Sequence, residues 1–347
     1  MKTELLRLAA VAFCITLLPS PFDAARAQTE AGLSKVGVID RTFKIAKPYD
    51  WRGAKTHALI CTIWYPADPS SQEQPQWIGP PDKPLFSAGK AAPGAPLLSS
   101  LASFPLITLS HGTGGSAVQM AWLGTVLASN GYVAIAVNHP GNNGYDGYTA
   151  LGFSIWWERA RDLSTIIDQI LADPKFRGRI DTKRIGAAGF SLGGYTMIEI
   201  AGGITQPAAF MDFCKSPRAD GICKSPPEFP TLLEDFDRLS KTDPEFKAAL
   251  AHAGDSYRDP RVRSVFAIAP ALGPAFSAAS LKKIQIPVEI VAGAEDTNVP
   301  VASSAQFFAA NIPGSKLTIF PGHVGHYVFL DTCTEQGRRI LPPLLCI

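Results

Sequence analysis

The chain has 347 residues, of which 46% are hydrophobic and 18% charged, and its formal net charge is +2. This near balance of charge, with no dense run of basic residues, argues against a nucleic-acid-binding protein. The hydrophobic content suffices for one large core and the sequence contains no internal repeat, so we expect a single folded domain.

The N-terminal residues have the pattern of a secretory signal peptide. Lys2 and Arg7 precede an uncharged apolar run at residues 8–18, and Ala25 and Ala27 form an A-x-A cleavage site. A bilayer-spanning helix needs about 20 residues, so this run is too short for one, although a buried N-terminal helix is an alternative. We predict a signal peptide at residues 1–27 and an exported domain, periplasmic or secreted, at residues 28–347.

Short apolar, β-branched runs alternate with longer helical patterns along the remaining chain. Strands are predicted at residues 57–65, 104–110, 132–138, 184–190, 262–269, 288–292 and 316–321. Helices are predicted at residues 117–129, 154–171, 192–202, 233–252, 301–310 and 335–340. This alternation predicts an α/β fold with a mostly parallel sheet and helices on both faces. We expect strand 57–65 to be antiparallel near an edge, and the segment 72–96, rich in Pro, Gly and Ser, to be a surface loop.

A single serine lies among glycines where strand 184–190 meets the next helix. Gly189, Ser191 and Gly193 form the pattern G-x-S-x-G, and a strand-to-helix turn is the context that identifies a nucleophile elbow. The glycines flank the serine because side chains there would collide across so sharp a turn. The alternative is a plain helix cap, a position that serine favours.

An acid and a base follow the serine in the order that this type of site requires. Asp296 lies after strand 288–292, with Glu295 beside it as a solvated loop charge. Two histidines, His323 and His326, follow the last strand, and either could accept the proton of Ser191 while the acid fixes the tautomer.

The loop 110–115, "SHGTGG", has accessible backbone N–H groups and follows another strand. The N–H groups of Thr113 and Leu192 are the candidate oxyanion donors, and His111 is expected to hold the loop without a catalytic role. A phosphate cradle would need a Lys-Ser/Thr pair or a G-x-G-x-x-G pattern, and both are missing. The histidines lack a third ligand at suitable spacing, so we expect no metal and no cofactor.

Five cysteines follow the predicted signal peptide. Cys214 lies close to Cys223, and Cys333 lies close to Cys346. In an oxidising compartment these spacings predict two local disulfides, which leaves Cys61 unpaired in a strand.

The chain resembles an α/β-hydrolase of the group that joins platelet-activating-factor acetylhydrolases with predicted dienelactone-hydrolase-like esterases. The resemblance rests on "TIWYPA", "SHGTGG", "NHPGNN", "ERARDLSTIIDQIL", "GFSLGGYT", "APALGPAF", "GAEDTNVP" and "HYVFLDTC". It implies that His326, which precedes an aromatic residue and a Phe-Leu pair, is the base, and that Thr113 is the first oxyanion donor. Phe190 departs from the group, which usually has histidine there, and we expect it in the core beside the elbow. Residues 203–260 resemble the lid insertion of this group.

These residues predict a serine esterase with catalytic Ser191, Asp296 and His326. Its partner is a small-molecule ester, and we expect no nucleic acid and no stable membrane insertion, while the oligomeric state stays open. Alternatives are hydrolysis of a lactone, dienelactone or amide by the same residues, or a non-catalytic binding protein of this fold. We predict a short acyl group because the lid mixes apolar residues with cations, namely Phe210, Met211, Phe213 and Phe229 with Lys215, Arg218 and Lys224.

Overall fold

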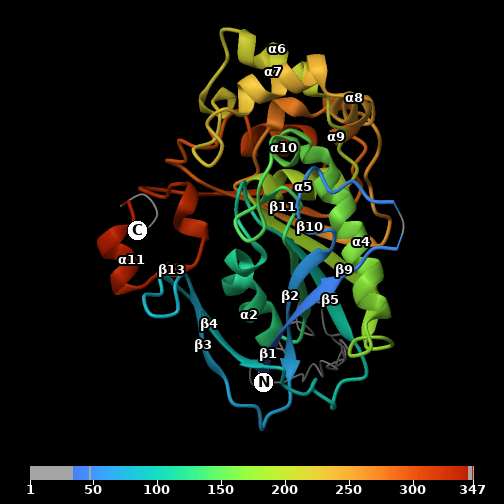
Figure 1. Cartoon of the computed structure of the whole chain (residues 1–347), viewed down its shortest axis with the longest axis vertical. Helices are drawn as coiled ribbons and strands as arrows, with labels where there is room; N and C mark the ends of the chain where they lie inside the picture. The colour runs from blue at the N-terminus through green and yellow to red at the C-terminus, as the bar shows by residue number, and fades with distance from the viewer. Residues whose placement is uncertain (1–33, 47, 343–345, 347) are drawn as a thin grey trace, which may run out of the picture. The chain divides into compact units, whose positions relative to one another are not determined.

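A central sheet organises the domain (Figure 1). The computed structural model describes residues 34–46, 48–342 and 346, so the predicted signal peptide at residues 1–27 lies outside them. Within these residues eleven strands form one sheet in the order β12-β11-β10-β9-β5-β6-β2-β1-β4-β13, with β3 paired to β4. The strands are β1 Lys35–Phe43, β2 Leu59–Ala67, β3 Gln74–Ile78, β4 Phe86–Pro93, β5 Phe104–Ser110, β6 Val133–Val137, β9 Ile180–Phe190, β10 Val262–Ile268, β11 Val288–Gly293, β12 Lys316–Phe320 and β13 Thr332–Cys333. A separate pair joins β7 Asn142–Asn143 to β8 Gly147–Tyr148.

The predicted parallel sheet is confirmed for the six strands from β12 to β6, each of which runs parallel to its neighbour. β2 is antiparallel to both β6 and β1, also as predicted. Its expected place near an edge is wrong, because β1, β4 and β13 continue the sheet beyond it.

Helices cover both faces of the sheet. They are η1 Ala117–Met120, α2 Ala121–Ser129, α3 Ala150–Ser154, η2 Trp156–Glu158, α4 Arg159–Ala172, α5 Leu192–Ile200, α6 Pro207–Lys215, η3 Gly221–Cys223, α7 Leu232–Thr242, α8 Pro244–Ala251, η4 Gly273–Ala275, α9 Ala278–Leu281, α10 Ala305–Asn311, η5 His326–Phe329 and α11 Glu335–Ile340. In β6, Val133 and Ile135 pack in the core that contains α4, α5 and α10, whereas Ala134 packs in the core that contains α2. This alternation is expected where a strand is buried on both faces.

The segment 72–96 corrects a prediction, because it is part of the sheet and not a surface loop. It contains β3 and β4, which pair antiparallel, and β4 also pairs with β1 and with β13 near the C-terminus. Pro75 lies beside a shift in register, where its missing N–H is tolerated. The Pro, Gly and Ser content of this segment did not indicate strands, because β4 is stabilised by pairing with β1 and β13, which are distant in sequence.

Two helix predictions also need correction. The predicted helix 233–252 is two helices, α7 and α8, because Pro244 cannot continue a helix and instead begins one. The Asp243 side chain caps α8 by accepting a hydrogen bond of 2.8 Å from the Phe246 N–H. The predicted helix 154–171 is divided among the end of α3, η2 and α4. The remaining predicted elements differ from the structure mainly at their ends.

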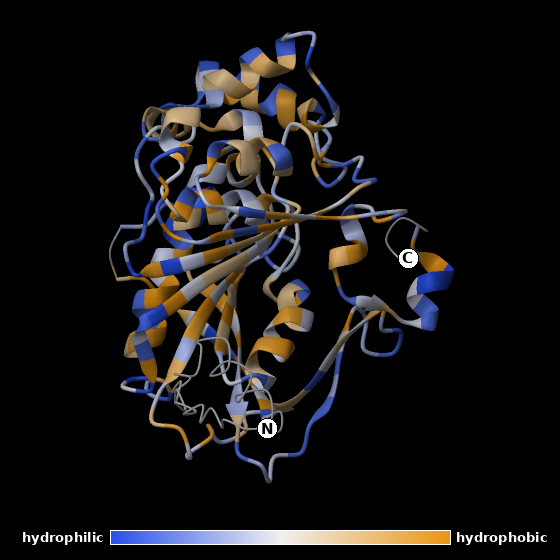
Figure 2. Cartoon of the chain, turned by 180° about the vertical axis from the view of Figure 1, so that it is seen from behind, coloured by the Kyte–Doolittle hydropathy of each residue, from blue (hydrophilic) through white to orange (hydrophobic). Residues whose placement is uncertain are grey.

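Residues 203–260, which we call the lid segment, contain α6, η3, α7 and α8. Figures 1 and 2 show these helices together at one end of the sheet, with hydrophilic and hydrophobic residues mixed along them. Both predicted disulfides are confirmed: Cys214 is bonded to Cys223 within the lid segment, and Cys333 to Cys346. Cys61 is buried in β2 and forms no disulfide. None of the helices within the described ranges has both the length and the apolar character needed to cross a bilayer.

Candidate active site

Ser191 lies at the sharp turn between β9 and α5. Its backbone has φ 57° and ψ −116°, a conformation that costs a residue with a side chain of the order of 1–3 kcal/mol. The neighbouring strand holds it there, because the Ser191 N–H donates to the Ile268 carbonyl at 2.8 Å, while the Ser191 carbonyl accepts from Ala271 at 3.1 Å. The turn therefore has the strained geometry that lifts a serine hydroxyl above a sheet.

The two glycines of G-x-S-x-G are required by close backbone approach. A Cβ on Gly189 would lie 2.4 Å from the Gly193 carbonyl oxygen, so the predicted collision across the turn is confirmed. A Cβ on Gly193 would lie 2.0 Å from the carbonyl oxygen of Ser110. Gly193 therefore also allows the elbow to pack against the end of β5.

Ser191, His326 and Asp296 form one chain of hydrogen bonds. His326 Nε2 lies 2.9 Å from Ser191 Oγ, and His326 Nδ1 lies 2.6 Å from Asp296 Oδ2. The other oxygen of Asp296 accepts from the N–H groups of Asn298 and Val299 at 3.0 and 2.8 Å. These backbone donors orient the carboxylate, which in turn fixes the imidazole with Nε2 facing the serine.

The His326 imidazole packs between aromatic side chains. Its ring centroid lies 4.7 Å from that of Phe190 and 5.2 Å from that of Tyr327, and His326 is 4% exposed. Phe190 is buried beside the elbow, as expected, and it also supports this ring. The sequence pattern did not indicate the contact between Phe190 and His326, whereas the aromatic residue after His326 was part of the motif.

His323 lies elsewhere and has a different partner. Its Nδ1 lies 2.9 Å from Glu295 Oε2, and its side chain is 96% exposed. The Glu295 carboxylate raises the pKa of His323 through a hydrogen bond and charge attraction. The two acids and two histidines therefore form two separate pairs, and the pair in contact with Ser191 is Asp296–His326.

The candidate oxyanion donors lie beside the serine. Thr113, Leu192 and Ser191 all line the same pocket. Leu192 is the first residue of α5, where backbone N–H groups have no partner within the helix. Within the described residues, no protein acceptor is recorded for the N–H of either Thr113 or Leu192. Both amides are thus available to a developing negative charge.

Both ring nitrogens of His111 hydrogen-bond to backbone groups, and its ring centroid lies 5.0 Å from that of His139. Its Nδ1 hydrogen-bonds to the Gly112 carbonyl at 2.7 Å, and its Nε2 accepts from the His139 N–H at 3.3 Å. Burial, Arg159 and His139 lower its pKa well below the usual value. A neutral ring with its proton on Nδ1 therefore holds the loop.

A pocket of about 380 Å³ lies above Ser191. Its apolar wall joins α3 and η2 to the lid segment, through Phe153, Trp156, Phe210, Met211, Ile222, Leu232 and Phe236. The Trp156 and Phe236 rings stack with centroids 5.9 Å apart. The sequence-based prediction did not include Phe153 and Trp156 as pocket residues. The aromatic run "FSIWW", next to a helical pattern, was the feature that could have indicated them.

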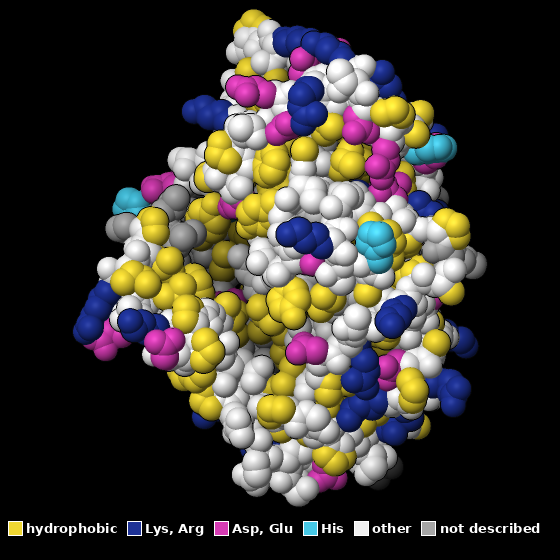
Figure 3. Space-filling model, in the orientation of Figure 1, with side chains coloured by type: hydrophobic (Ala, Val, Ile, Leu, Met, Phe, Trp, Pro, Cys, Tyr) yellow, Lys and Arg dark blue, Asp and Glu magenta, His cyan; other side chains and the backbone are white. Residues whose placement is uncertain are grey.

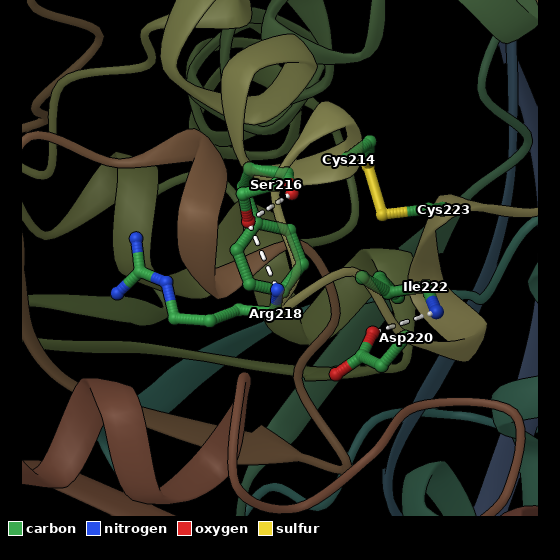
Figure 4. The surroundings of a disulfide bond; sticks show 7 residues. Cys214, Ser216, Arg218, Asp220, Ile222 and Cys223 are labelled. Carbon is green, nitrogen blue, oxygen red and sulfur yellow. Dashed lines mark hydrogen bonds between the residues drawn. A yellow bond between two sulfur atoms is a disulfide. The ribbon is translucent and has the colours of Figure 1, made fainter.

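The lid residues predicted to wall the pocket only partly do so. Phe210, Met211 and Lys224 line it, whereas Phe213 and Arg218 line a separate hollow next to η4 and α10. In Figure 4 the Arg218 side chain extends away from the Cys214–Cys223 disulfide. Phe229 contributes indirectly, by stacking on Phe153 with centroids 4.7 Å apart.

A profile of the alpha/beta hydrolase family matches residues 107–336, and the chain belongs to this family. The matched span contains Ser191, Asp296 and His326. The α/β-hydrolase fold expected from the resemblance is thereby confirmed.

Curated relatives match over shorter stretches. Cutinase est1 of Thermobifida alba is 34% identical over 101 residues, which cover 28% of this chain and 31% of that protein. Bis(hydroxyethyl) terephthalate hydrolase of Streptomyces coelicolor is 31% identical over 106 residues, covering 30% of this chain and 31% of that protein. The chain therefore spans about a third of the length of the curated relatives it matches.

A solved structure is similar over most of the domain. The ferulic acid esterase from Streptomyces cinnamoneus is 19% identical with a TM-score of 0.54, covering 85% of this chain and 76% of that chain. At this identity the likeness concerns the fold alone.

Proposed function

We propose that the protein is a serine hydrolase that cleaves carboxylic esters through an acyl-enzyme. Ser191 Oγ attacks the ester carbonyl carbon while His326 Nε2 takes its proton. His326 then gives this proton to the leaving alkoxide as the ester C–O bond breaks. Water, activated by the same imidazole, releases the acid and restores Ser191.

The Asp296 carboxylate and two backbone N–H groups assist without entering the covalent chemistry. Asp296 holds His326 in the tautomer that accepts at Nε2, and it stabilises the imidazolium that forms. The N–H groups of Thr113 and Leu192 donate to the oxyanion of the tetrahedral intermediate, an effect worth about 10²–10³ in rate for one donor.

One observation carries this proposal: a continuous hydrogen-bonded chain from Ser191 Oγ to Asp296 Oδ2 lies beside a pocket of about 380 Å³. The names of the relatives, cutinases and a terephthalate hydrolase, agree with ester hydrolysis. Membership of the group of platelet-activating-factor acetylhydrolases and dienelactone-hydrolase-like esterases is a finer part of the same proposal, and it rests on the motifs.

The substrate that we propose has a compact acyl group. A pocket volume of about 380 Å³ is near the lower end of ligand sites, which run from about 300 to 1,000 Å³. Aromatic side chains form much of the wall, and Lys224 and Glu228 are the charged residues beside it. A further methylene gains about 0.8 kcal/mol only while it is buried, so activity should peak at a short acyl chain.

The lid segment is proposed to set this limit. Figure 4 shows the Cys214–Cys223 disulfide closing its turn, where the Ser216 hydroxyl and the Asp220 carboxylate accept from the backbone N–H groups of Arg218 and Ile222 at 3.2 and 3.1 Å. A Cβ on Gly221 would lie 2.9 Å from the Thr297 carbonyl oxygen, so this turn packs on the loop that follows Asp296.

Export through the signal peptide at residues 1–27 completes the proposal. The two disulfides support an oxidising compartment. The N-terminal sequence of the protein recovered outside the cytoplasm tests it, and the predicted mature protein begins at Gln28.

An ester panel tests the activity. We expect kcat/KM for p-nitrophenyl esters to be highest at about two to four acyl carbons, with Ser191→Ala inactive on all of them. A kcat/KM that rises steadily to long chains would contradict the compact pocket. Turnover retained by Ser191→Ala would contradict the mechanism. A lactone and an anilide in the same panel separate ester hydrolysis from its alternatives.

A further inference from the structure

Arg159 is a buried guanidinium behind the oxyanion loop. It is the first residue of α4, it is 1% exposed, and it does not line the pocket. Among the described residues no carboxylate lies within ion-pair distance of it. Buried charges are usually paired because their desolvation is expensive, so a guanidinium kept here without a paired carboxylate needs a reason.

Of the four hydrogen bonds that the Arg159 side chain makes to described residues, two reach the loop at residues 110–115, and its Nε donates to Thr196 Oγ1 in α5 at 3.4 Å. Its Nη2 donates to the His111 carbonyl and to Ser110 Oγ, the latter at 3.2 Å. Its Nη1 donates to Asn142 Oδ1 at 3.2 Å. The planar guanidinium can make these bonds together because its donors have a fixed fork geometry.

Asn142 binds the loop on the other side of Thr113. Its Oδ1 also accepts from the Gly114 N–H at 2.9 Å, and its Nδ2 donates to the Gly152 carbonyl at 3.3 Å. Arg159 therefore restrains the carbonyl at residue 111, and Asn142 restrains the amide at residue 114. The Thr113 peptide lies between these two fixed points.

A second set of contacts supports the start of the loop. His139 Nε2 lies 2.9 Å from Ser110 Oγ, and His139 Nδ1 lies 2.6 Å from Asp162 Oδ2. Asp162 in turn pairs with Arg52 at 2.7 Å. This array has the order of a second Ser-His-Asp site, but Ser110 and His139 are fully buried and take part in holding the loop.

We propose that Arg159 and Asn142 are positioning residues that orient the Thr113 N–H toward the oxyanion. The proposal rests on the proposed esterase function and explains why the motifs "NHPGNN" and "ERARD" accompany "SHGTGG" in this chain. Arg159 acts through His111 and Asn142, since it does not reach the pocket itself.

The test compares Arg159→Lys and Asn142→Ala with Arg179→Lys as the matched control. Arg179 is the same residue type and its guanidinium also donates to backbone carbonyls, but these belong to Leu98, Leu101 and Ala102 before β5 and not to the oxyanion loop. The readouts are kcat and KM on a soluble p-nitrophenyl ester, the inhibition constant of a trifluoromethyl ketone, and thermal unfolding. The ketone is informative because its adduct with serine carries an oxyanion.

We expect kcat to fall about 10²-fold in Arg159→Lys and Asn142→Ala with KM nearly unchanged, as for the loss of one oxyanion donor. Ketone inhibition should weaken by a similar factor. Arg179→Lys should lower the melting temperature but keep kcat and ketone affinity within a few-fold.

Two results overturn the inference: unchanged kcat and ketone affinity in folded Asn142→Ala and Arg159→Lys, or equal losses in Arg179→Lys. If Arg159→Lys does not fold, Asn142→Ala decides alone. Ester hydrolysis that persists in Ser191→Ala overturns the proposed function and this inference with it. Hydrolysis that Ser191→Ala abolishes, but that the positioning variants retain, overturns the inference only.

Discussion

The two walls of the pocket are built differently. On the sheet side, the loops after β9, β11 and β12 hold Ser191, Asp296 and His326, all nearly buried and joined by hydrogen bonds. On the lid side, the buried residues of α6, α7 and α8 are one each, Phe210, Leu239 and Phe246. Figure 3 shows charged side chains of both signs on the surface over α6 and α7.

This difference separates chemistry from selectivity. The sheet-side residues are held by hydrogen bonds and by close backbone packing. Small substitutions among them should therefore severely lower activity or stability. Lid-side atoms are placed by aromatic stacking and one disulfide, so changes there should mainly alter which esters fit. Four predictions test the contrast.

The largest effect is expected at the histidines. His326→Ala should lower kcat by about 10⁴–10⁶-fold, because Ser191 would lose the base that takes its proton. His323→Ala is the matched control, since His323 is exposed and pairs with Glu295, and we expect it to keep nearly full activity. Steady-state kinetics on one ester decide, and the reverse ranking would assign the base to His323.

Glycines provide a second contrast, this time in stability. Gly193→Ala should destabilise the fold by several kcal/mol, because its Cβ would lie 2.0 Å from the Ser110 carbonyl oxygen. Gly254→Ala, in the lid segment, should change stability by less than about 0.5 kcal/mol, since the nearest atom is 4.0 Å away. Urea unfolding measures both, and similar midpoints for the two variants would contradict the contrast.

The disulfides differ in what they should affect. Replacing Cys214 and Cys223 by serine removes a crosslink across 9 residues, and replacing Cys333 and Cys346 removes one across 13. Each loss should cost about 3 kcal/mol on the chain-entropy estimate. Because Gly221, Ile222 and Lys224 line the pocket, only the first pair should also change acyl preference, by a few-fold in kcat/KM. The ester panel, run on both double variants, would contradict this if both changed it equally.

The features that could be predicted from the sequence are those that depend on residues close together in the chain. The serine turn, the order of acid and histidine, and both disulfides depend on neighbours in the chain, and local pattern sufficed to propose them. The hairpin of β3 and β4 did not follow from local pattern, because β4 is held by β1 and by β13 from the far end of the chain.

Side-chain partnerships were the other omission. The contact of Phe190 with His326, and the stacking of Trp156 on Phe236, join segments that no spacing rule relates. Arg159 appeared only as one letter of a helical motif, and its bonds to the oxyanion loop depend on how α4 packs against β5. Tertiary contacts of this kind become visible only once the fold is known.

The smallest effect per group that we predict concerns the stability of the fold in acid. His111 and His139 lie behind the oxyanion loop, and the pKa of each is lowered well below its usual value, first by burial and then by Arg159. For His139 these effects outweigh the hydrogen bond to Asp162. In the unfolded chain both histidines would titrate near pH 6.5. The unfolded state therefore binds more protons in acid, and the stability that the neutral rings contribute is present above pH 6.5 and lost as the pH falls.

Between pH 7 and pH 5 this loss should reach about 2 kcal/mol for each histidine that stays neutral in the fold. Urea unfolding of the wild type and of His139→Gln at pH 7, 6 and 5 measures it, and the variant should lose about 2 kcal/mol less between pH 7 and pH 5. The comparison removes the opposite contribution of Glu199 and Asp331, whose pKa values are raised by burial in both proteins. His323 is the contrasting case on the exposed side: its pKa is raised by Glu295, so any contribution has the opposite sign, and His323→Ala should leave the slope nearly unchanged. The same loss of stability in the wild type and in His139→Gln would mean that the His139 ring accepts a proton in the folded state, and the polar network around Arg159 would then lack the rigidity that we assign to it.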